Sequence, residues 1–317
     1  MKPLSFKPIL AASKPRDYTD QMFYDRLVFP VIATPKLDGI RCLTRDIPRP
    51  PDYRCEVLTR SLKSIPNDWI HYQIGTKCPP GLDGEIITYN KDLFLGETVR
   101  DFNLVSSDVM TYGGQPNFKY HVFDSHIESG LAYQHRLIRL KNWEKLPDFC
   151  VIVPITQCNN LAELLAYEEK CVAEGYEGIC FRDPNSKYKY GRSTLREGHL
   201  IKMKRFITEE AVIIGTYEEM ANNNPQAINE LGYAERTSHS ANMIGKGRLG
   251  GFHCKLLSDS NISFNVGSGF TAAQREEYWN NRESLFGKII TFKHQPHGAL
   301  EAPRIPIFIG FRDAKDL

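Results

Sequence analysis

The sequence predicts a two-domain protein of the α+β class, in which a domain of mixed strands and helices precedes a small β-barrel. The 317 residues suffice for about two domains at ~150 residues each. Strands and helices are mixed up to about residue 205, and short β-rich runs separated by Gly, Asn and Pro turns follow. Apolar residues make up 41% and charged residues 25% of the chain, which excludes fibrous, disordered and disulfide-scaffold classes.

The first domain is expected over residues 1–205. Helical potential lies around residues 18–27. Two further helices are predicted, one over residues 131–146 with Leu131, His135, Ile138 and Trp143 facing inward, and one over residues 160–174 that ends at Gly175. The expected strands lie at 28–34, 40–44, 86–89, 120–123, 178–182 and 200–204.

The second domain is expected over residues 206–317. One helix is predicted near residues 272–281, and five strands with one helix are typical of a small barrel such as an OB-fold. A polar stretch near residues 232–251 interrupts the barrel pattern as a long insertion, which is usually functional or disordered. The expected strands lie at 211–216, 251–257, 262–266, 288–292 and 305–311.

The charge distribution and the cysteine content further restrict the class of protein. The net charge is +2, but residues 184–206 carry seven Lys or Arg against one Glu, which indicates either a polyanion contact or a solvated face. None of the eight cysteines forms a C-x-x-C pair or a zinc-type cluster with histidine, so reduced thiols are expected. Pro3, Lys7 and Pro8 interrupt any signal-peptide core, and no apolar run approaches the ~20 residues of a membrane helix. We expect a chain that is not exported and has no membrane partner.

A motif with chemical meaning follows the first predicted strand: Lys36-x-Asp38-Gly39-x-Arg41. Alone it is equally a glycine turn with solvated charges. Four further motifs follow in order: Asp83-Gly-Glu85, Tyr120-His-Val-Phe-Asp124, Glu177-Gly-Ile-Cys-Phe-Arg182 and Leu200-Ile-Lys-Met-Lys204. Together they resemble the covalent nucleotidyltransferase superfamily of ATP-dependent DNA ligases, RNA ligases and mRNA capping enzymes. Residues 33–43, 183–194, 229–233, 267–275 and 303–312 are similar to the minimal, Chlorella virus-type DNA ligases.

The resemblance covers nearly the whole chain from about residue 28. It implies an ATP-grasp-like nucleotidyltransferase domain of antiparallel sheets and helices at 1–205, then an OB-fold at 206–317 with a latch-like insertion near 232–251. The implied function is an ATP-dependent DNA ligase that seals 3′-hydroxyl/5′-phosphate nicks through a lysyl-AMP and a DNA-adenylate, in replication, repair and recombination. Thr34 stands where many other ligases have Glu, which points to the viral subgroup.

The resemblance makes Lys36 the nucleophile that attacks the α-phosphate of ATP. An ammonium cannot attack, so its pKa has to fall, and we expect Lys202, Lys204 and a bound metal to lower it. In a strand, Lys202 and Lys204 point to one face, which suits gripping a phosphate from one side. Asp38 is implied to assist near the nucleophile and in the joining step.

The acidic and aromatic motif residues are implied to hold the nucleotide. Glu177 is expected to bind Mg²⁺ or Mn²⁺, because bare carboxylates beside phosphate would repel it. Glu85 resembles the residue that holds the ribose and is also a candidate metal ligand. The alternative for either Glu is a salt bridge to lysine. Phe123 resembles the aromatic that stacks on adenine, and Thr34 the residue that reads its edge.

Basic residues are implied to contact phosphates. Arg41, Arg60 and Arg192 resemble arginines that hold the nucleotide and the 5′-phosphate side of the nick, because a guanidinium pairs with phosphate through two bonds. The insertion residues Arg236, Lys246 and Arg248 are expected on the DNA backbone. In the second domain, Lys293 and Arg304 resemble residues that orient the β- and γ-phosphates of ATP as pyrophosphate leaves, and Asp316 matches an acidic position of the family near that chemistry.

Two alternatives stay open. One is an enzyme on another nucleic acid, an RNA ligase or a capping guanylyltransferase; Thr34 and the latch-like insertion argue against capping. The other is a non-catalytic module that only binds nicks. The expected partner is nicked duplex DNA, around which a monomer closes, in the cytoplasm or at a viral replication site.

Overall fold

The computed structural model describes residues 6–15, 17–92, 96–143, 146–295 and 302–312. The chain divides into two compact units, Met1–Lys204 and Arg205–Leu317. None of the helices in the described ranges has the length and apolar character needed to cross a membrane.

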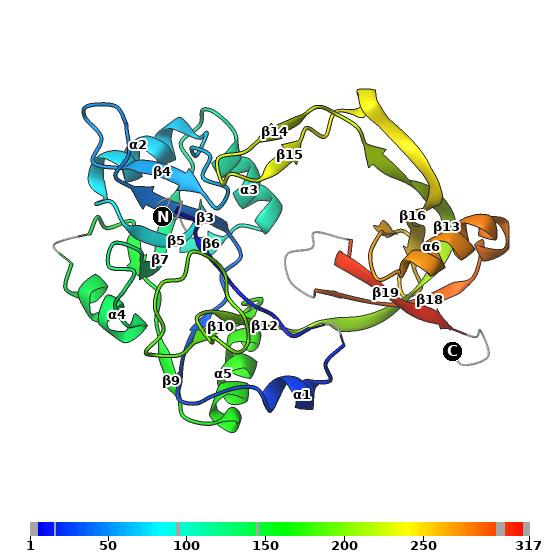
Figure 1. Ribbon diagram of the computed structural model, residues 1–317, viewed down its shortest axis with the longest axis horizontal. Helices are drawn as coiled ribbons and strands as arrows, with labels where there is room; N and C mark the ends of the chain where they lie inside the picture. The colour runs from blue at the N-terminus through cyan, green and yellow to red at the C-terminus, as the bar shows by residue number, and fades with distance from the viewer. Residues whose placement is uncertain (1–5, 16, 93–95, 144–145, 296–301, 313–317) are drawn as a thin grey trace. The chain divides into compact units, whose positions relative to one another are not determined.

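A six-stranded sheet forms one half of the first unit (Figure 1). Its strands follow the order β4-β3-β5-β7-β8, with β6 also paired to β5; all pairs are antiparallel except β7–β8. Helices α2, α3 and α4 pack against this sheet. The bounds are β3 Ile40–Arg45, β4 Glu56–Thr59, α2 Asp68–Lys77, β5 Leu82–Asp92, β6 Gly96–Val99, α3 Phe102–Met110, β7 Phe118–Ser125, α4 Tyr133–Lys141 and β8 Cys150–Ile152.

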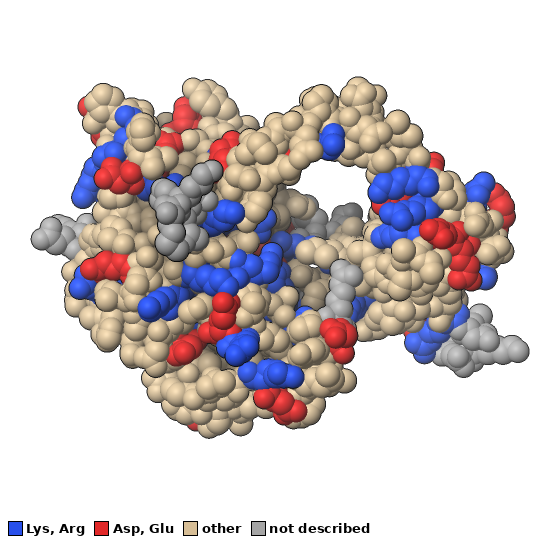
Figure 2. All heavy atoms as spheres, viewed as in Figure 1, with Lys and Arg blue, Asp and Glu red and all other residues tan. Residues whose placement is uncertain are grey.

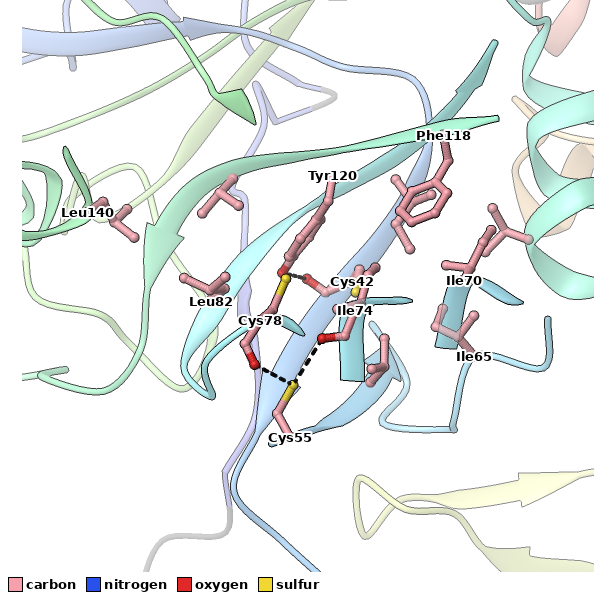
Figure 3. Close-up of a cluster of buried hydrophobic side chains, with 14 of the residues drawn as sticks. Cys42, Cys55, Ile65, Ile70, Ile74, Cys78, Leu82, Phe118, Tyr120 and Leu140 are labelled. Atoms are coloured by element: carbon pink, nitrogen blue, oxygen red, sulfur yellow. Dashed lines mark hydrogen bonds between the residues drawn. The ribbon is translucent and has the colours of Figure 1, made fainter. Parts of the chain in front are cut away.

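The helix-covered face of this sheet holds the larger core of the unit (Figure 3). Along β7, Phe118, Tyr120 and Val122 are buried, while the intervening side chains point to the opposite face. The Tyr120 hydroxyl donates to the Cys42 carbonyl at 3.0 Å, so the polar tip of this buried ring is satisfied. All eight cysteines are free thiols.

The inner face of α4 differs from the one predicted. Tyr133, Arg136, Leu137 and Leu140 are buried, whereas the predicted inner residue Ile138 is 55% exposed and His135 is also exposed. Arg136 is 1% exposed because Asp124 accepts from its Nε and Nη2 at 2.8 and 3.0 Å. A prediction from the spacing of apolar residues cannot identify a charged residue that is buried because a carboxylate pairs with it.

A four-stranded antiparallel sheet forms the other half of the first unit, in the order β12-β10-β2-β9. Helix α5 packs on it, and its N-cap Asn160 accepts from the Glu163 N–H at 2.9 Å. Phe23 of α1 joins the same core. The bounds are α1 Asp20–Tyr24, β2 Val31–Pro35, β9 Thr156–Cys158, α5 Leu161–Ala173, β10 Gly178–Arg182 and β12 Ile201–Lys204.

The second unit is built on a five-stranded antiparallel sheet in the order β17-β16-β13-β18-β19. A single bridge from Ser268 to Ile307 links the two edges, so the barrel is partly open, as in OB-folds. Helix α6 begins with a capping box between Thr271 and Gln274. The bounds are β13 Ile207–Asn222, β16 Met243–Leu256, β17 Ser263–Val266, α6 Ala272–Asn280, β18 Ile289–Gln295 and β19 Arg304–Arg312.

The bounds of the insertion differ from those predicted, which were near 232–251. Residues from Met243 onward belong to β16, which pairs with β13 as far as Asn222. The segment between these strands carries a small hairpin, β14 (Gln226–Ile228) paired with β15 (Ala234–Arg236). The full length of the strand β16 was not predicted, because its sequence is rich in Gly and Lys. Its stability comes from pairing with a distant strand rather than from its own residues.

Candidate active site

Lys36 lies where β2 runs into the turn before β3. Its backbone N–H donates to the Gly178 carbonyl at 2.8 Å, which continues the β2–β10 pairing. The turn passes so close to β5 that a Cβ on Gly39 would lie 2.3 Å from the Ile86 carbonyl oxygen. Glycine is therefore required in this motif for the approach of two backbones. Asp38 lies in the same turn and is partly exposed.

Glu177 connects the lysine of this turn to a second lysine. It is 6% exposed and forms ion pairs with the ammonium groups of Lys36 and Lys204, the latter at 2.9 Å. Burial alone would raise the pKa of Glu177, but the two ammonium groups outweigh it and lower the pKa. The three side chains thus form one alternating-charge cluster.

The Lys36 pKa differs from the prediction. Burial favours the neutral amine, but Glu177 outweighs burial and raises the pKa of Lys36. The lysines whose pKa is lowered are Lys202 and Lys204, through burial and the nearby Lys36. The salt bridge to lysine that was the alternative for Glu177 is present, because the β2–β10 pairing brings this carboxylate against Lys36.

Arg41 and Glu85 face each other across two strands. They are cross-strand partners in β3 and β5, and Arg60 follows β4 beside them. The Arg41 guanidinium is bidentate to buried Asp83, with Nε–Oδ1 at 2.6 Å and Nη2–Oδ2 at 2.7 Å. Burial raises the pKa of Glu85 to about 7, although Lys36 and Arg41 oppose the rise.

Phe123 occupies a β-bulge. Asp83 pairs with Asp124 and Gly84 with Val122, so Phe123 is the unpaired extra residue of β7. The centroid of its ring lies 4.9 Å from Arg41 Cζ. Bulges re-aim side chains, and this one presents an aromatic ring on the face opposite the core.

These side chains share one cavity within the first unit. Thr34 contributes its buried hydroxyl, which donates to the Cys180 carbonyl at 3.3 Å. Asp38, Glu177 and Lys204 are not in the lining, although the latter two contact Lys36. The sequence-predicted residues that line the cavity are Thr34, Lys36, Arg41, Arg60, Glu85, Phe123, Arg192 and Lys202.

Sequence reasoning missed several residues of this cavity. Arg182 lines it, is 4% exposed, forms an ion pair with Asp124 and lies 4.1 Å from the Tyr133 ring. Arg182 and Asp124 are the last residues of two of the motifs. This position within the motifs is the signal that could have identified them as site residues. Leu10 and Ala11 also line the cavity, and nothing in the residues themselves indicates it.

Glu85 and Glu177 are suited to bind a metal ion that the phosphates of a substrate also coordinate. The described part of the chain has no group of three or more His, Cys, Asp and Glu side chains placed to hold an ion. Glu177 and Glu85 are separate carboxylates beside a basic cavity. Mg²⁺ is commonly bound by one or two carboxylates together with substrate phosphates, so this donor set fits it.

The predicted residues of the second unit that the structure describes lie on its strands. Lys293 on β18 lies 5.7 Å from the Phe206 ring, and Arg304 begins β19. Glu219 accepts from Lys246 Nζ at 2.6 Å and Arg248 Nε at 2.8 Å, and these bonds lower its pKa to about 2. Asp316 lies outside the described residues. Arg236, at the end of β15, donates to the Asn224 carbonyl.

Basic side chains gather on the surface of each unit. Figure 2 shows a band of Lys and Arg across the first unit, with few acidic side chains among them. On the second unit, Lys and Arg form a patch beside the α6 region. Polyanions bind to such basic patches.

Comparison with known proteins agrees with this geometry. Residues 8–204 match the family profile described as "ATP dependent DNA ligase domain", and residues 244–312 match "DNA ligase OB-like domain". No curated protein matches the sequence at a significant level.

Solved structures give the same assignment. A Chlorella virus DNA ligase-adenylate shares 30% sequence identity, with a TM-score of 0.50 over 97% of this chain and 98% of that one. A Lig E DNA ligase shares the fold at 21% identity, with a TM-score of 0.64 over 89% and 92% of the two chains. Nothing in these comparisons supports an RNA ligase, a capping enzyme or a non-catalytic module. The chain belongs to the family of ATP-dependent DNA ligases, with a nucleotidyltransferase-type domain followed by an OB-like domain.

Proposed function

We propose that this ligase seals nicks in duplex DNA in three steps with Lys36 as its nucleophile. Lys36 Nζ attacks the α-phosphate of ATP, forming a P–N bond and breaking the bond to the β-phosphate, so that pyrophosphate leaves. AMP then passes from Lys36 to the 5′-phosphate of the nick, which breaks the P–N bond. The 3′-hydroxyl attacks this 5′-phosphate, and AMP leaves. The observation that carries this proposal is the cluster of Lys36, Glu177 and Lys204 beside a cavity lined by Phe123 and Glu85.

The lysine cluster has to change its charge state before the first step. Paired to Glu177, Lys36 is held as an ammonium, which has no lone pair for attack. Glu177, with Glu85, would hold Mg²⁺ or Mn²⁺, whose charge competes with the Lys36 ammonium for the carboxylate and neutralises phosphate charge. Lys202 and Lys204 would then grip the α-phosphate from one side.

The proposed nucleotide contacts are those that the resemblance implies, and they are supported by the presence of these residues in the cavity lining. Phe123 stacks on adenine, Thr34 reads the adenine edge, and Glu85 holds the ribose. Arg41, Arg60 and Arg192 contact the nucleotide and the 5′-phosphate side of the nick; all line the cavity. Asp38, in the turn after Lys36, acts near the nucleophile and in the joining step.

The second unit supplies phosphate and DNA contacts. Lys293 and Arg304 orient the β- and γ-phosphates as pyrophosphate leaves, and Asp316 acts near that chemistry. Arg236, Lys246 and Arg248 contact the DNA backbone without reading sequence. Because Glu219 binds both Lys246 and Arg248, DNA phosphates have to compete with a carboxylate for these two cations.

The biological setting proposed is DNA replication, repair and recombination. The chain acts as a monomer that closes around nicked duplex DNA, in the cytoplasm or at a viral replication site. Its two units are taken as domains at 1–205 and 206–317, with the hairpin region between β13 and β16 as the latch. The support for closure is the basic surface on both units (Figure 2).

Labelled ATP with Mg²⁺ tests the proposal. Wild type and Lys170→Ala, whose lysine is exposed and pairs with Glu174 at 3.8 Å, are expected to acquire covalent label that nicked DNA discharges into a sealed product. Lys36→Ala is expected to remain unlabelled. Wild type that stays unlabelled after pyrophosphate treatment to remove pre-bound AMP would overturn the proposal. Label that only nicked RNA discharges would overturn the DNA substrate.

A further inference from the structure

The residues before the first helix bind directly to the basic side of the cavity. Strand β1 (Ile9–Leu10) pairs in parallel with β11 (Gly191–Arg192). We call residues 9–12 the N-terminal strap. Its four successive carbonyls each accept one hydrogen bond: from Arg41 Nη2 at 3.2 Å, Ser193 N–H at 2.8 Å, Arg192 Nη1 at 3.0 Å and Lys202 N–H at 2.9 Å.

Tyr188 links this strap to Asp83. The residue is 3% exposed; its hydroxyl accepts from the Ile9 N–H at 3.3 Å and donates to Asp83 Oδ2 at 2.6 Å. Burial and the nearby Asp83 raise the pKa of Tyr188 well above its usual range, so the hydroxyl keeps the proton that it donates. Tyr188 therefore fixes two groups that both bind Arg41.

Arg41 is the shared target of these contacts. Of its five N–H donors, two bind Asp83 and one binds the Ile9 carbonyl, which holds the planar guanidinium in one orientation. Within the described ranges, Nη1 makes no hydrogen bond, and Arg41 lines the cavity. One end of the fork is thus left for a ligand.

We propose that Tyr188 and the N-terminal strap are positioning elements of the active site, which hold Arg41 so that Nη1 meets a phosphate oxygen of the nucleotide or the nick. This inference rests on the proposed function, because it assigns a phosphate ligand to Arg41. It gives the first residues of the chain a role in phosphate recognition although they lie outside the predicted motifs.

Tyr188→Phe is the direct test, with Tyr190→Phe as its matched control. Tyr190 belongs to the same apolar cluster, 6.2 Å from Tyr188 between ring centroids, and its hydroxyl has no hydrogen bond within the part of the chain described. The measurement is the single-turnover rate of AMP transfer from purified ligase-adenylate to nicked DNA. We expect Tyr188→Phe to slow transfer about tenfold, the size of one charge-assisted hydrogen bond, and Tyr190→Phe to leave it unchanged. Thermal melting of each variant establishes that it is folded.

A double-mutant cycle separates positioning from general loss of structure. Arg41→Lys keeps a cation beside buried Asp83 but removes the guanidinium fork. If Tyr188 acts through Arg41, Tyr188→Phe slows transfer less than about twofold in the Arg41→Lys background. Equal slowing in both backgrounds, or a Tyr188→Phe rate equal to that of wild type, would overturn the inference. Wild type that labels and seals DNA keeps the proposed function intact in either case.

Discussion

Lys36, Glu177 and Lys204 set one another's charge. The carboxylate between the two lysines raises the pKa of Lys36 and has its own pKa lowered by both of them. Removing Glu177 would leave two lysine charges without their shared counter-ion, which is costly, whereas removing either lysine would leave Glu177 paired with the other. In the ligand-free site Lys36 is therefore held as an ammonium, and the attack proposed for it requires the loss of this proton.

Gly39 tests how closely the lysine turn approaches β5. Gly39→Ala places a Cβ 2.3 Å from the Ile86 carbonyl oxygen, so the turn must move. We expect a loss of ~1–3 kcal/mol in unfolding free energy and strongly reduced labelling of Lys36. Gly130→Ala is the control, because nothing lies within 4 Å of its Cβ. Urea unfolding and labelled ATP measure both effects; equal behaviour of the two variants would contradict the prediction.

Glu85 should make stability depend on pH. Burial raises its pKa from 4.5 to about 7, so the folded state holds the proton more tightly than the unfolded state. The stabilising contribution is full at low pH and is lost as pH rises from about 4.5 to 7. Glu85→Gln should flatten this fall in unfolding free energy by ~1–2 kcal/mol, after screening by water in the cavity.

Urea unfolding of the nucleotide-free protein across this pH range measures the effect of Glu85. Glu128→Gln, at an exposed surface pair with Arg139, is the control and should leave the slope unchanged. A wild-type slope in Glu85→Gln would show that the carboxyl titrates normally in the folded protein.

At the scale of elements, the side chains of β7 alternate between the core and the opposite face of the sheet. Phe118, Tyr120 and Val122 enter the core, whereas Lys119, His121 and Phe123 face the other way. Tyr89 and His121 are joined at 2.7 Å on that second face. The bulge adds one residue and so gives Phe123 its place beside Arg41.

Phe123 and Phe118 therefore predict opposite phenotypes on one strand. Phe123→Ala should raise the ATP concentration for half-maximal labelling about tenfold or more through lost stacking, while Phe123→Tyr should retain binding. Phe118→Leu should lower stability by ~1 kcal/mol and leave ATP use unchanged. Labelling titrations and thermal melts measure the two effects. An unchanged ATP requirement in Phe123→Ala would exclude Phe123 as the adenine platform.

At the scale of the whole molecule, the proposal assigns two kinds of phosphate contact to the two units. The first unit contains the complete cavity with Lys36, and the second carries Lys293 and Arg304 on β18 and β19. The OB-like sheet is continuous through these two strands. The second unit is therefore needed in the proposal for the leaving pyrophosphate, and not for the lysine cluster itself.

Lys293→Ala tests this division of labour. We expect formation of lysyl-AMP to slow at least about tenfold, because a phosphate loses its charged donor. Sealing of a nick that already carries AMP should be retained, since no pyrophosphate leaves in that step. Lys288→Ala, at an exposed lysine that precedes the same strand, is the control. Equal loss in both reactions would assign Lys293 to DNA binding or folding instead.

Much of the fold was predictable where local patterns are strong. Helix α5 was predicted to within a residue, because Asn160 and Gly175 bound an amphipathic run. Helices α2 and α3 were not predicted. They are short, and α2 is rich in polar and aromatic residues whose helical state depends on packing against β4.

By itself, the sequence determined the order of the motifs and, through their resemblance, the ligase family. Of the residues expected from that resemblance, eight line the Lys36 cavity, whereas Asp38, Glu177 and Lys204 do not, and the lining residues Leu10, Ala11 and Arg182 were not predicted. Only the tertiary structure decided the protonation of Lys36, the bulge at Phe123 and the contacts of the N-terminal strap. Each depends on atoms far apart in the chain, brought together by strand register and burial. Glu177 is 141 positions from Lys36 and Ile9 is 32 from Arg41, so neither contact leaves a local signature.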